Sequence, residues 1–374
     1  MAGPVRYHLG KFPPDDLEWK RLIPLIGPAN AGLARYDGLL SAIPNSQVLL
    51  SPLTTQEAVL SSKIEGTNVT IGEVLEIEAG GESEAFTQPK RDDAEEVLNY
   101  RKAMVTAVKE LRQRPISQHL IRSIHAQLMQ GVRGKNKSPG QIRTDQNWIG
   151  SPGCPIDEAS FVPIAPEHLP QGLDDWERFV ATDPDLDVLV HLALIHVEFE
   201  ALHPFQDGNG RLGRMLIPLY LYHRGLLSSP EFYMSGYLET NRDLYLERLR
   251  SVSRHGDWTS WCEFFLRGIQ EQASENERKA RAILDLYEQV KLKVVDTTHS
   301  QHSIRAVDFL FQTPIFSGSA FTGRSDIPKP TANRILRILR DEGLLLPIRE
   351  GRGRSPGVYA FRELLNIAED DEVF

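Results

Sequence analysis

Apolar residues recur with helical spacing over most of this chain. The spacing predicts one helix over residues 15–43, a second over 54–64 and a long third helix over 92–111. Glycine, serine, acidic residues and proline predict a loop over residues 80–90, and helices dominate again as far as about residue 298. The pattern therefore predicts a mainly α-helical protein.

One interruption of the helical pattern lies at residues 138–166. This segment is rich in glycine and proline and contains two short apolar pieces, Trp148–Ile149 and Phe161–Ile164. Short apolar runs between turn residues are typical of β-strands. We expect an exposed β-hairpin here.

The pattern changes again towards the C-terminus. A predicted connector helix over 271–296 is followed by a helix from Ile304, a short loop and a helix over Lys329–Glu342. Two apolar segments, Leu344–Leu346 and Gly357–Phe361, then flank a basic, glycine-rich loop. This order of helix, turn, helix and strand pair is typical of a winged helix-turn-helix.

The C-terminal module carries a local positive charge. Nine basic and four acidic residues lie between Arg324 and Arg362, an excess of five positive charges. A module of this kind can contact DNA, dock a protein or join two copies in a homodimer, and the acidic tail Glu369–Glu372 would repel phosphates. All of these roles stay open. The residues expected to face DNA are Thr331, Asn333, Arg334 and Arg337 on the second helix, with Arg352 and Arg354 on the wing.

The composition is that of an ordinary globular protein. Its 374 residues suffice for two or three domains, and a net charge of −9 argues against binding nucleic acid or an anionic membrane through bulk charge. Cys154 and Cys262 lack the spacing of a metal site. No signal peptide or membrane-spanning stretch is recognisable. We therefore expect a cytoplasmic protein without a membrane partner.

Residues with useful chemistry are concentrated between His203 and Arg214, in the sequence HPFQDGNGRLGR. An apolar helix over 186–202 runs into this stretch, and a new apolar pattern begins at Leu212, so Gly208–Gly210 should lie at the start of the next helix. The N–H groups and the dipole at a helix start attract anions, and glycines allow a phosphate to approach. The stretch therefore predicts a phosphate-binding turn.

The side chains of this stretch suit the same chemistry. Arg211 and Arg214 are three positions apart and can reach one polyphosphate, while Asp207 offers a carboxylate for Mg²⁺. The ordinary pKa of a histidine side chain, about 6.5, suits His203 to the removal of a proton from a hydroxyl. Taken singly, each residue also fits a helix cap, a turn or a surface ion pair. Their combination within twelve positions favours the functional interpretation.

HPFQDGNGRLGR resembles the signature of Fic-domain proteins at every key position. The resemblance implies a helical Fic core with a β-hairpin flap. It implies transfer of AMP from ATP to a Ser, Thr or Tyr hydroxyl of a target protein, or of the protein itself. His203 would be the general base and Asp207 would bind Mg²⁺. The residues implied to hold the ATP phosphates are Gly208, Asn209, Gly210, Arg211, Gly213 and Arg214.

Residues 61–66, SSKIEG, resemble the inhibitory motif of those Fic proteins whose inhibitory helix precedes the core. Ser61 and Glu65 are four positions apart and share a face of the predicted helix. The resemblance implies that Glu65 pairs with Arg214 and leaves ATP in an unproductive pose. In some relatives the same glutamate supports removal of AMP, so de-AMPylation is a second expected activity. The alternative is an ordinary solvated glutamate.

Two further groups of residues resemble parts of Fic proteins. Gly140–Arg143 and Asn147–Gly150 resemble the segment that leads into the flap, whose edge could pair with an extended piece of the target. Tyr237, Asn241 and Tyr245 are spaced by four, on one predicted helical face, and the family places such residues near the adenine. Core packing is the alternative for tyrosines at this spacing.

These expectations divide the chain into four parts. They are an N-terminal helical region with the inhibitory motif (1–110), a Fic catalytic core (111–270), a connector helix (271–300) and a winged-helix domain (301–374). The expected function is that of an autoinhibited protein adenylyltransferase using ATP and Mg²⁺. The alternative is a DNA-binding transcriptional regulator whose Fic core senses nucleotide.

Overall fold

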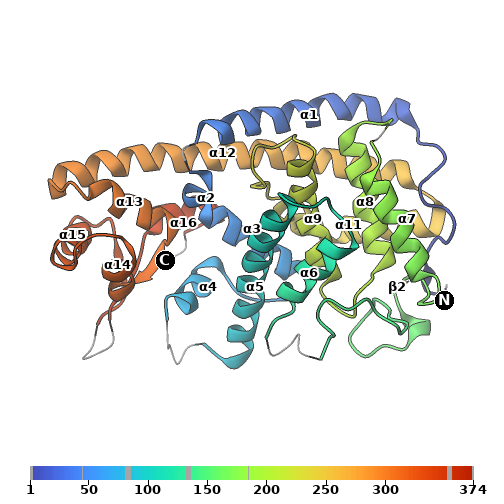
Figure 1. Cartoon of the computed structure of the whole chain (residues 1–374), viewed down its shortest axis with the longest axis horizontal. Helices are drawn as coiled ribbons and strands as arrows, with labels where there is room; N and C mark the ends of the chain where they lie inside the picture. The colour runs from blue at the N-terminus through green and yellow to red at the C-terminus, as the bar shows by residue number, and fades with distance from the viewer. Residues whose placement is uncertain are drawn as a thin grey trace. The chain divides into compact units, whose positions relative to one another are not determined.

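The computed structural model describes residues 3–43, 45–80, 86–131, 136–183, 185–351 and 356–372. These residues are mainly helical with small sheets, which confirms the predicted fold class (Figure 1). The chain forms two compact units, one of Met1–Asp37 with Asn99–Ser274 and one of Gly38–Leu98 with Glu275–Phe374. The HPFQDGNGRLGR stretch belongs to the first unit and the SSKIEG segment to the second. The four-part division stays a prediction.

The first unit is built mostly from helices. Three long helices, α1 (Trp19–Ala42), α5 (Gln88–Leu111) and α12 (Trp258–Thr298), contribute residues to both units. The other elements of the first unit are β1 (Val5–Arg6), α6 (Gln118–Leu128), the 3₁₀ turn η1 (Ile156–Glu158), β2 (Phe161–Val162), α7 (Leu169–Ala181), α8 (Val188–Leu202), α9 (Asn209–His223), α10 (Ser235–Thr240) and α11 (Arg242–His255).

Helices α8 and α9 form the buried centre of the first unit. Residues 189–202 of α8 and 209–221 of α9 are all buried, and α6, α7 and α11 pack against the pair. The indole Nε1 of Trp176 donates to Ile195 O at 3.1 Å, and that of Trp261 donates to Ala193 O at 2.7 Å. A helix that is apolar all round has to be covered on every side. The turn between the two helices therefore starts and ends at buried points.

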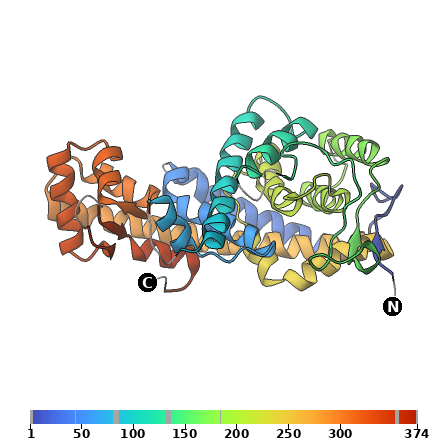
Figure 2. The ribbon, with the colours of Figure 1, turned by 90° about the horizontal axis from the view of Figure 1, so that it is seen from below.

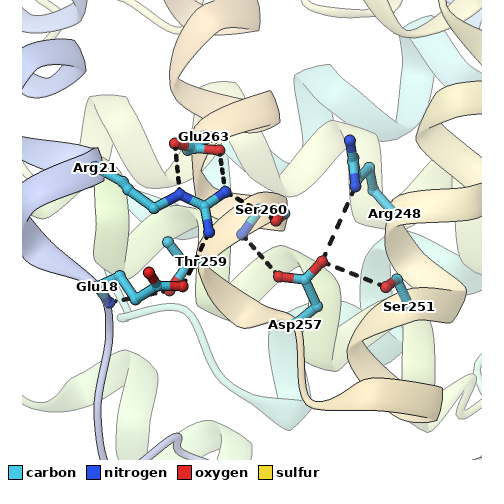
Figure 3. A network of polar contacts seen from close by, with 8 residues as sticks. All are labelled: Glu18, Arg21, Arg248, Ser251, Asp257, Thr259, Ser260 and Glu263. Atoms are coloured by element: carbon cyan, nitrogen blue, oxygen red, sulfur yellow. Dashed lines mark hydrogen bonds and ion pairs between the residues drawn. The ribbon is translucent and has the colours of Figure 1, made fainter.

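Helix α12 begins at Trp258, well before the predicted connector at 271–296. Asp257 caps it, because its Oδ1 accepts the N–H of Ser260 at 3.2 Å. Arg21 of α1 donates to both carboxylate oxygens of Glu263, at 3.1 and 2.6 Å (Figure 3). The residues of the predicted connector helix therefore lie within a longer helix of 41 residues that runs to Thr298.

Proline explains why two helices start earlier than predicted. Helices α3 (Ser51–Ile64) and α5 (Gln88–Leu111) each have proline as their second residue, Pro52 and Pro89. Proline in a sequence pattern suggests a break, but the first turn of a helix tolerates it because the missing N–H has no partner there. Both helices therefore extend over residues assigned to the preceding segment.

The predicted exposed hairpin at 138–166 differs in its second arm. Ile149 forms a single antiparallel bridge with Phe161, and η1 lies in the connection between them. Strand β2 pairs in parallel with β1, with Val5 opposite Phe161. Phe161 and Val162 are buried, whereas Trp148 and Ile149 remain exposed. A local pattern cannot reveal this, because the pairing partner comes from the start of the chain.

The N-terminal residues are fastened to helix α8 by a polar cluster. The carboxylate of Glu198 accepts the Tyr7 hydroxyl at 2.6 Å and contacts His8 Nε2 at 2.8 Å. The other ring nitrogen of His8 contacts Ser253 Oγ at 2.8 Å. Burial, together with the Glu198 charge, raises the pKa of the Tyr7 hydroxyl well above its usual range, so the group stays a donor at neutral pH. The cluster secures β1, and through it β2, to the first unit.

The second unit combines the SSKIEG helix with the C-terminal elements, which appear in orange and red in Figure 2. Its sheet has the order β3–β5–β4, with antiparallel pairs. The two predicted helices and the strand pair are present, and a strand at Ile315–Ser317 and a helix at Gly318–Arg324 are additional elements between the two helices. The elements are α2 (Ser46–Leu49), α3 (Ser51–Ile64), α4 (Ile71–Glu78), α13 (Ser303–Gln312), β3 (Ile315–Ser317), α14 (Gly318–Arg324), α15 (Lys329–Asp341), β4 (Leu346–Arg349), β5 (Val358–Ala360) and α16 (Arg362–Glu369).

The residues expected to face DNA are only partly described. Asn333, Arg334 and Arg337 are exposed on α15, while Thr331 is half-buried. The guanidinium of Arg334 donates to Thr298 O at 3.0 Å. The wing residues Arg352 and Arg354 lie outside the described residues.

Helix α3 packs against α16 and α13 within the second unit. The Ser51 hydroxyl at its start donates to Gln312 O at 2.9 Å. Helix α4, which the pattern did not predict, begins at a capping box made by Thr70 and Glu73. Its first N–H, from Ile71, donates to the carboxylate of Glu369 at 2.9 Å. The predicted inhibitory motif is thus packed among C-terminal helices.

The acidic tail is held by cations. Asp370 forms ion pairs with Arg278 and, at 2.8 Å, with Lys279, and Lys279 also donates to Ala368 O at 2.7 Å. Tertiary contacts from α12 and α4 thus hold the first two residues of the acidic tail, and the expected repulsion of phosphates stays a prediction.

Within the described ranges, none of the helices has the length and the apolar character that crossing a bilayer requires.

Removing the hydroxyl that joins β1 to α8 tests the role of the N-terminal residues. Tyr7→Phe is expected to lower the free energy of unfolding by about 1.5–3 kcal/mol, because a hydrogen bond to a buried carboxylate is lost. Urea denaturation measures the change. Tyr222→Phe, at a half-buried tyrosine of α9 outside this cluster, is the matched control. Equal stability of the Tyr7 variant and the wild type would show that the N-terminal residues do not secure the fold.

Candidate active site

The turn between α8 and α9 is built on two residues with left-handed backbone. His203 caps α8 with φ 47° and ψ 60°, and its N–H donates to Phe199 O at 3.1 Å. Gly208 precedes α9 with φ 76°. A side chain at positive φ is unfavourable, so His203 keeps this conformation only because its surroundings impose it. Gly208–Gly210 lie at the start of α9, as the sequence predicts.

Asn209 closes the turn from within. Its Oδ1 accepts the N–H of Phe205 at 2.8 Å, and its Nδ2 donates to Phe205 O at 2.9 Å. A carboxamide has one acceptor and one donor group, so it can satisfy both polar groups of a single residue. The side chain of Asn209 therefore shapes the loop, while the first N–H groups of α9, which have no partner within the helix, are the donors suited to a ligand.

Two glycines of the stretch lie against side chains that a Cβ atom would displace. A Cβ atom at Gly208 would approach Met129 Sδ to 2.8 Å, and one at Gly213 would approach Glu200 Oε1 to 2.2 Å. Gly213 thus lets the carboxylate of Glu200 pack against α9. This contact gives it a structural role beside the phosphate-binding role that the resemblance implies.

Charged side chains gather at the start of α9. Arg211 is buried, with Nη2 3.7 Å from Asp207 Oδ1 and 3.8 Å from Met129 Sδ. Arg214 is only 1% exposed, and its charge contributes to lowering the pKa of His196. Asp207 keeps 46% of its side chain exposed, and its Oδ1 accepts the Gly208 N–H at 2.6 Å. The arrangement offers cations for an anionic ligand and one accessible carboxylate for a metal ion.

His125, on α6, was not recognised from the sequence. Its Nε2 lies 2.9 Å from Asp207 O and its Nδ1 accepts the Gly140 N–H at 2.8 Å, so the ring must carry its proton on Nε2. The ring stacks on Phe205 with centroids 3.8 Å apart. Burial lowers the pKa of His125 to about 4. No local pattern reveals this role, because the partner at Asp207 is 82 positions away.

His196 plays a similar part deeper in the unit. Its Nδ1 donates to Gly213 O at 3.1 Å, and its Nε2 accepts the Tyr245 hydroxyl at 2.9 Å. Burial lowers the pKa of His196 to about 3, and the Arg214 charge acts in the same direction. His196 is therefore a neutral structural residue that joins α8, α9 and α11.

The predicted adenine residues lie on two consecutive helices, although the N–H of Asn241 still donates to Tyr237 O at 3.0 Å and that of Tyr245 to Asn241 O at 2.8 Å. The helix is interrupted at Asn241, which ends α10 and precedes α11. Tyr237 and Asn241 are half-buried, and Asn241 Nδ2 donates to Tyr237 O at 2.9 Å. Tyr245 is buried in the core on His196 and Trp261. The placement of these three residues near an adenine stays a prediction, and the packing of Tyr245 fits the alternative of a core tyrosine.

Family models match much of the chain. The model of the Fic/DOC family N-terminal region matches residues 23–109, and the Fic/DOC family model matches residues 115–221, which include the turn between α8 and α9. The chain belongs to the Fic/DOC family. The resemblance seen in HPFQDGNGRLGR is thereby confirmed.

Relatives of this Fic/DOC protein include named adenylyltransferases. A probable protein adenylyltransferase of Aquifex aeolicus is 30% identical over 204 residues, which cover 54% of this chain and 56% of that protein. A protein adenylyltransferase of Caenorhabditis briggsae is 30% identical over 131 residues, which cover 32% of this chain and 23% of that protein. The chain thus spans about half, or less, of the length of these curated relatives.

Two solved structures share the Fic fold. A Fic family protein from Desulfovibrio desulfuricans G20 has a TM-score of 0.58 and 18% identity, covering 91% of this chain and 95% of that one. A Fic domain containing signaling protein from Bacteroides thetaiotaomicron has a TM-score of 0.52 and 17% identity, covering 70% and 97%. At this identity the likeness establishes the fold alone.

The buried neutral state of His125 predicts a pH dependence. The pKa of His125 is about 4 in the folded protein and about 6.5 in the unfolded chain. As the pH falls below 6.5, the unfolded chain takes up the proton before the folded protein does. The free energy of unfolding therefore decreases down to about pH 4. His125→Gln keeps a donor for Asp207 O but cannot titrate. Between pH 7 and pH 4.5 it is expected to lose about 2–3 kcal/mol less stability than the wild type.

Urea denaturation at a series of pH values measures this difference. His168→Gln, at an exposed histidine of the same unit, is the control and should keep the wild-type dependence. The assignment of a neutral His125 fails if the His125 variant loses stability with falling pH as steeply as the wild type.

Proposed function

We propose that this protein transfers AMP from ATP to the hydroxyl of a Ser, Thr or Tyr residue in a target protein. The observation that carries the proposal is the turn between α8 and α9. It sets His203 and the start of α9 at opposite ends of one closed loop, with Arg211 and Arg214 on the same helix. A base beside a phosphate-binding helix start is what attack on a phosphate requires.

The proposed roles follow from chemistry and position. The N–H groups of Gly208–Gly210, with Arg211 and Arg214, bind the phosphates of ATP. His203, half-buried at the edge of the turn, takes the proton from the attacking hydroxyl. The oxygen of the hydroxyl bonds to the α-phosphorus, and the bond from that phosphorus to the bridging oxygen breaks. Diphosphate leaves with the electron pair. Tyr237 and Asn241 are proposed to lie near the adenine.

Asp207 is the residue proposed to hold Mg²⁺. Its carboxylate is half-exposed at the mouth of the turn, and Mg²⁺ in proteins usually takes one or two carboxylates together with phosphate oxygens. The donor therefore fits the ion. When bound, Mg²⁺ would neutralise charge on the phosphates.

The target is proposed to dock along the outer edge of residues 147–150. Strand β2 already pairs with β1 along one of its edges. A target segment would therefore pair through its main chain with the other arm of the flap, which holds the exposed Trp148 and Ile149. Such pairing positions a hydroxyl without reading much sequence. A second copy of this protein could be the target as well, which would appear as self-modification.

Autoinhibition is proposed to act through Glu65. This residue caps the C-terminal end of α3, and Ser61 is buried one turn earlier on the same helix. The proposed pairing of Glu65 with Arg214 would compete with ATP for that guanidinium, because both offer anionic oxygens. The same glutamate would support a secondary removal of AMP.

Incubation with labelled ATP and Mg²⁺ tests the proposal. Glu65→Gly is expected to raise transfer of label to protein on the order of tenfold, the change that about 1.4 kcal/mol of relieved competition gives. Adding His203→Ala to that variant is expected to abolish transfer. Intact-protein mass spectrometry should show a gain of one AMP per modified chain.

Lys63→Gly is the matched control, since it also places a glycine in the last turn of α3 but leaves Glu65 intact. An equal rise in Lys63→Gly would exclude relief of a specific pairing. A mass gain of one phosphate would overturn AMP transfer. Absence of label in all variants, with salt-sensitive DNA binding by the full chain, would favour the nucleotide-sensing DNA-binding regulator instead.

A further inference from the structure

Arg143 is a buried cation in the segment that precedes the flap, and it is 4% exposed. All the acceptors of its guanidinium are backbone carbonyl oxygens. They are Leu202 O at 3.2 Å, His203 O at 2.9 Å, Ile164 O at 2.5 Å and Asp145 O at 3.1 Å, and the main-chain N–H of Arg143 also donates to Pro204 O at 3.0 Å.

Two of these acceptors lie at the end of α8. The last carbonyl groups of a helix have no N–H partner within it and carry the negative end of the helix dipole. Arg143 supplies donors and a positive charge to Leu202 O and His203 O. It thereby holds the turn in which His203 adopts its left-handed backbone.

The other two acceptors lie at the two ends of the flap. Asp145 precedes the exposed arm at residues 147–150, and Ile164 follows β2. A single planar guanidinium therefore joins both arms of the flap to the turn that carries His203. Lysine could replace it only in part, because an ammonium has three donors and no fixed fork.

We propose that Arg143 is a positioning residue that sets His203 against the flap and so aligns the target hydroxyl with the base. The inference rests on the proposed transfer of AMP. Arg143 acts through the backbone that it holds. Binding of ATP should not need it, because Asn209 closes the phosphate-binding loop independently.

The test uses the full chain with Glu65→Gly as the parent. Arg143→Met is expected to lower kcat for AMP transfer about 100-fold, the effect of a misplacement of about 1 Å, while KM for ATP changes less than about twofold. Arg143→Lys keeps the charge near α8 but reaches fewer carbonyls, so it should restore part of kcat. Arg122→Met is the matched control. Arg122 is an exposed arginine that donates to Gly140 O at 3.0 Å in the same segment, and its loss should leave kcat unchanged.

Hydrogen exchange of the same variants supplies a readout independent of activity. Amides of residues 145–150 and 203–207 should exchange faster in Arg143→Met, with the rest of the first unit unchanged. The proposal would be overturned if the kcat of Arg143→Met stayed within threefold of the parent. It would also be overturned if kcat and KM changed only in proportion to global unfolding of the variant. If Arg143→Met does not fold, Arg143→Lys decides by the same criteria. A parent that transfers no AMP would instead overturn the proposed function, and unchanged local exchange would then overturn the role of Arg143.

Discussion

The reversal of the chain between α8 and α9 is the constraint on which the first unit depends. Both helices are buried along their length, so the residues that connect them start and end inside the protein. Buried backbone polar groups need partners. Side chains supply many of them. Asn209 bonds to both groups of Phe205, Arg143 to the carbonyls of Leu202 and His203, and His125 to that of Asp207.

Buried histidines around this turn differ in kind from His203. His125 and His196 each accept one hydrogen bond and donate another, which requires the neutral ring, and burial lowers both pKa values far enough to keep it neutral. They are structural residues with fixed tautomers. His203 is half-buried at the edge of the turn, where its backbone is held in the left-handed region. The two buried rings are thus structural, and His203, to which more water has access, is the one proposed to act as a base.

The second unit contains both the helix with Ser61 and Glu65, from which autoinhibition is proposed, and the C-terminal strands and helices. The helix with Ser61 and Glu65 packs against α13 and α16, and the acidic end of α16 is tied to α12 and to the first turn of α4. The SSKIEG segment and the C-terminal strands and helices therefore belong to one packed body.

The sequence by itself determined the helical class, the break at His203, the helix start at Gly208–Gly210 and the family, because these depend on local spacing and on one contiguous motif. It failed where partners are distant in the chain. Tertiary contacts decide the pairing of β1 with β2, the hydrogen bonds of the Arg143 guanidinium and the tautomer of His125. Hydrogen-bond partners that are far apart along the chain leave no periodicity in the sequence. Tyr245 shows the same limit, because its hydrogen bond to His196, 49 positions away in the chain, places it in the core.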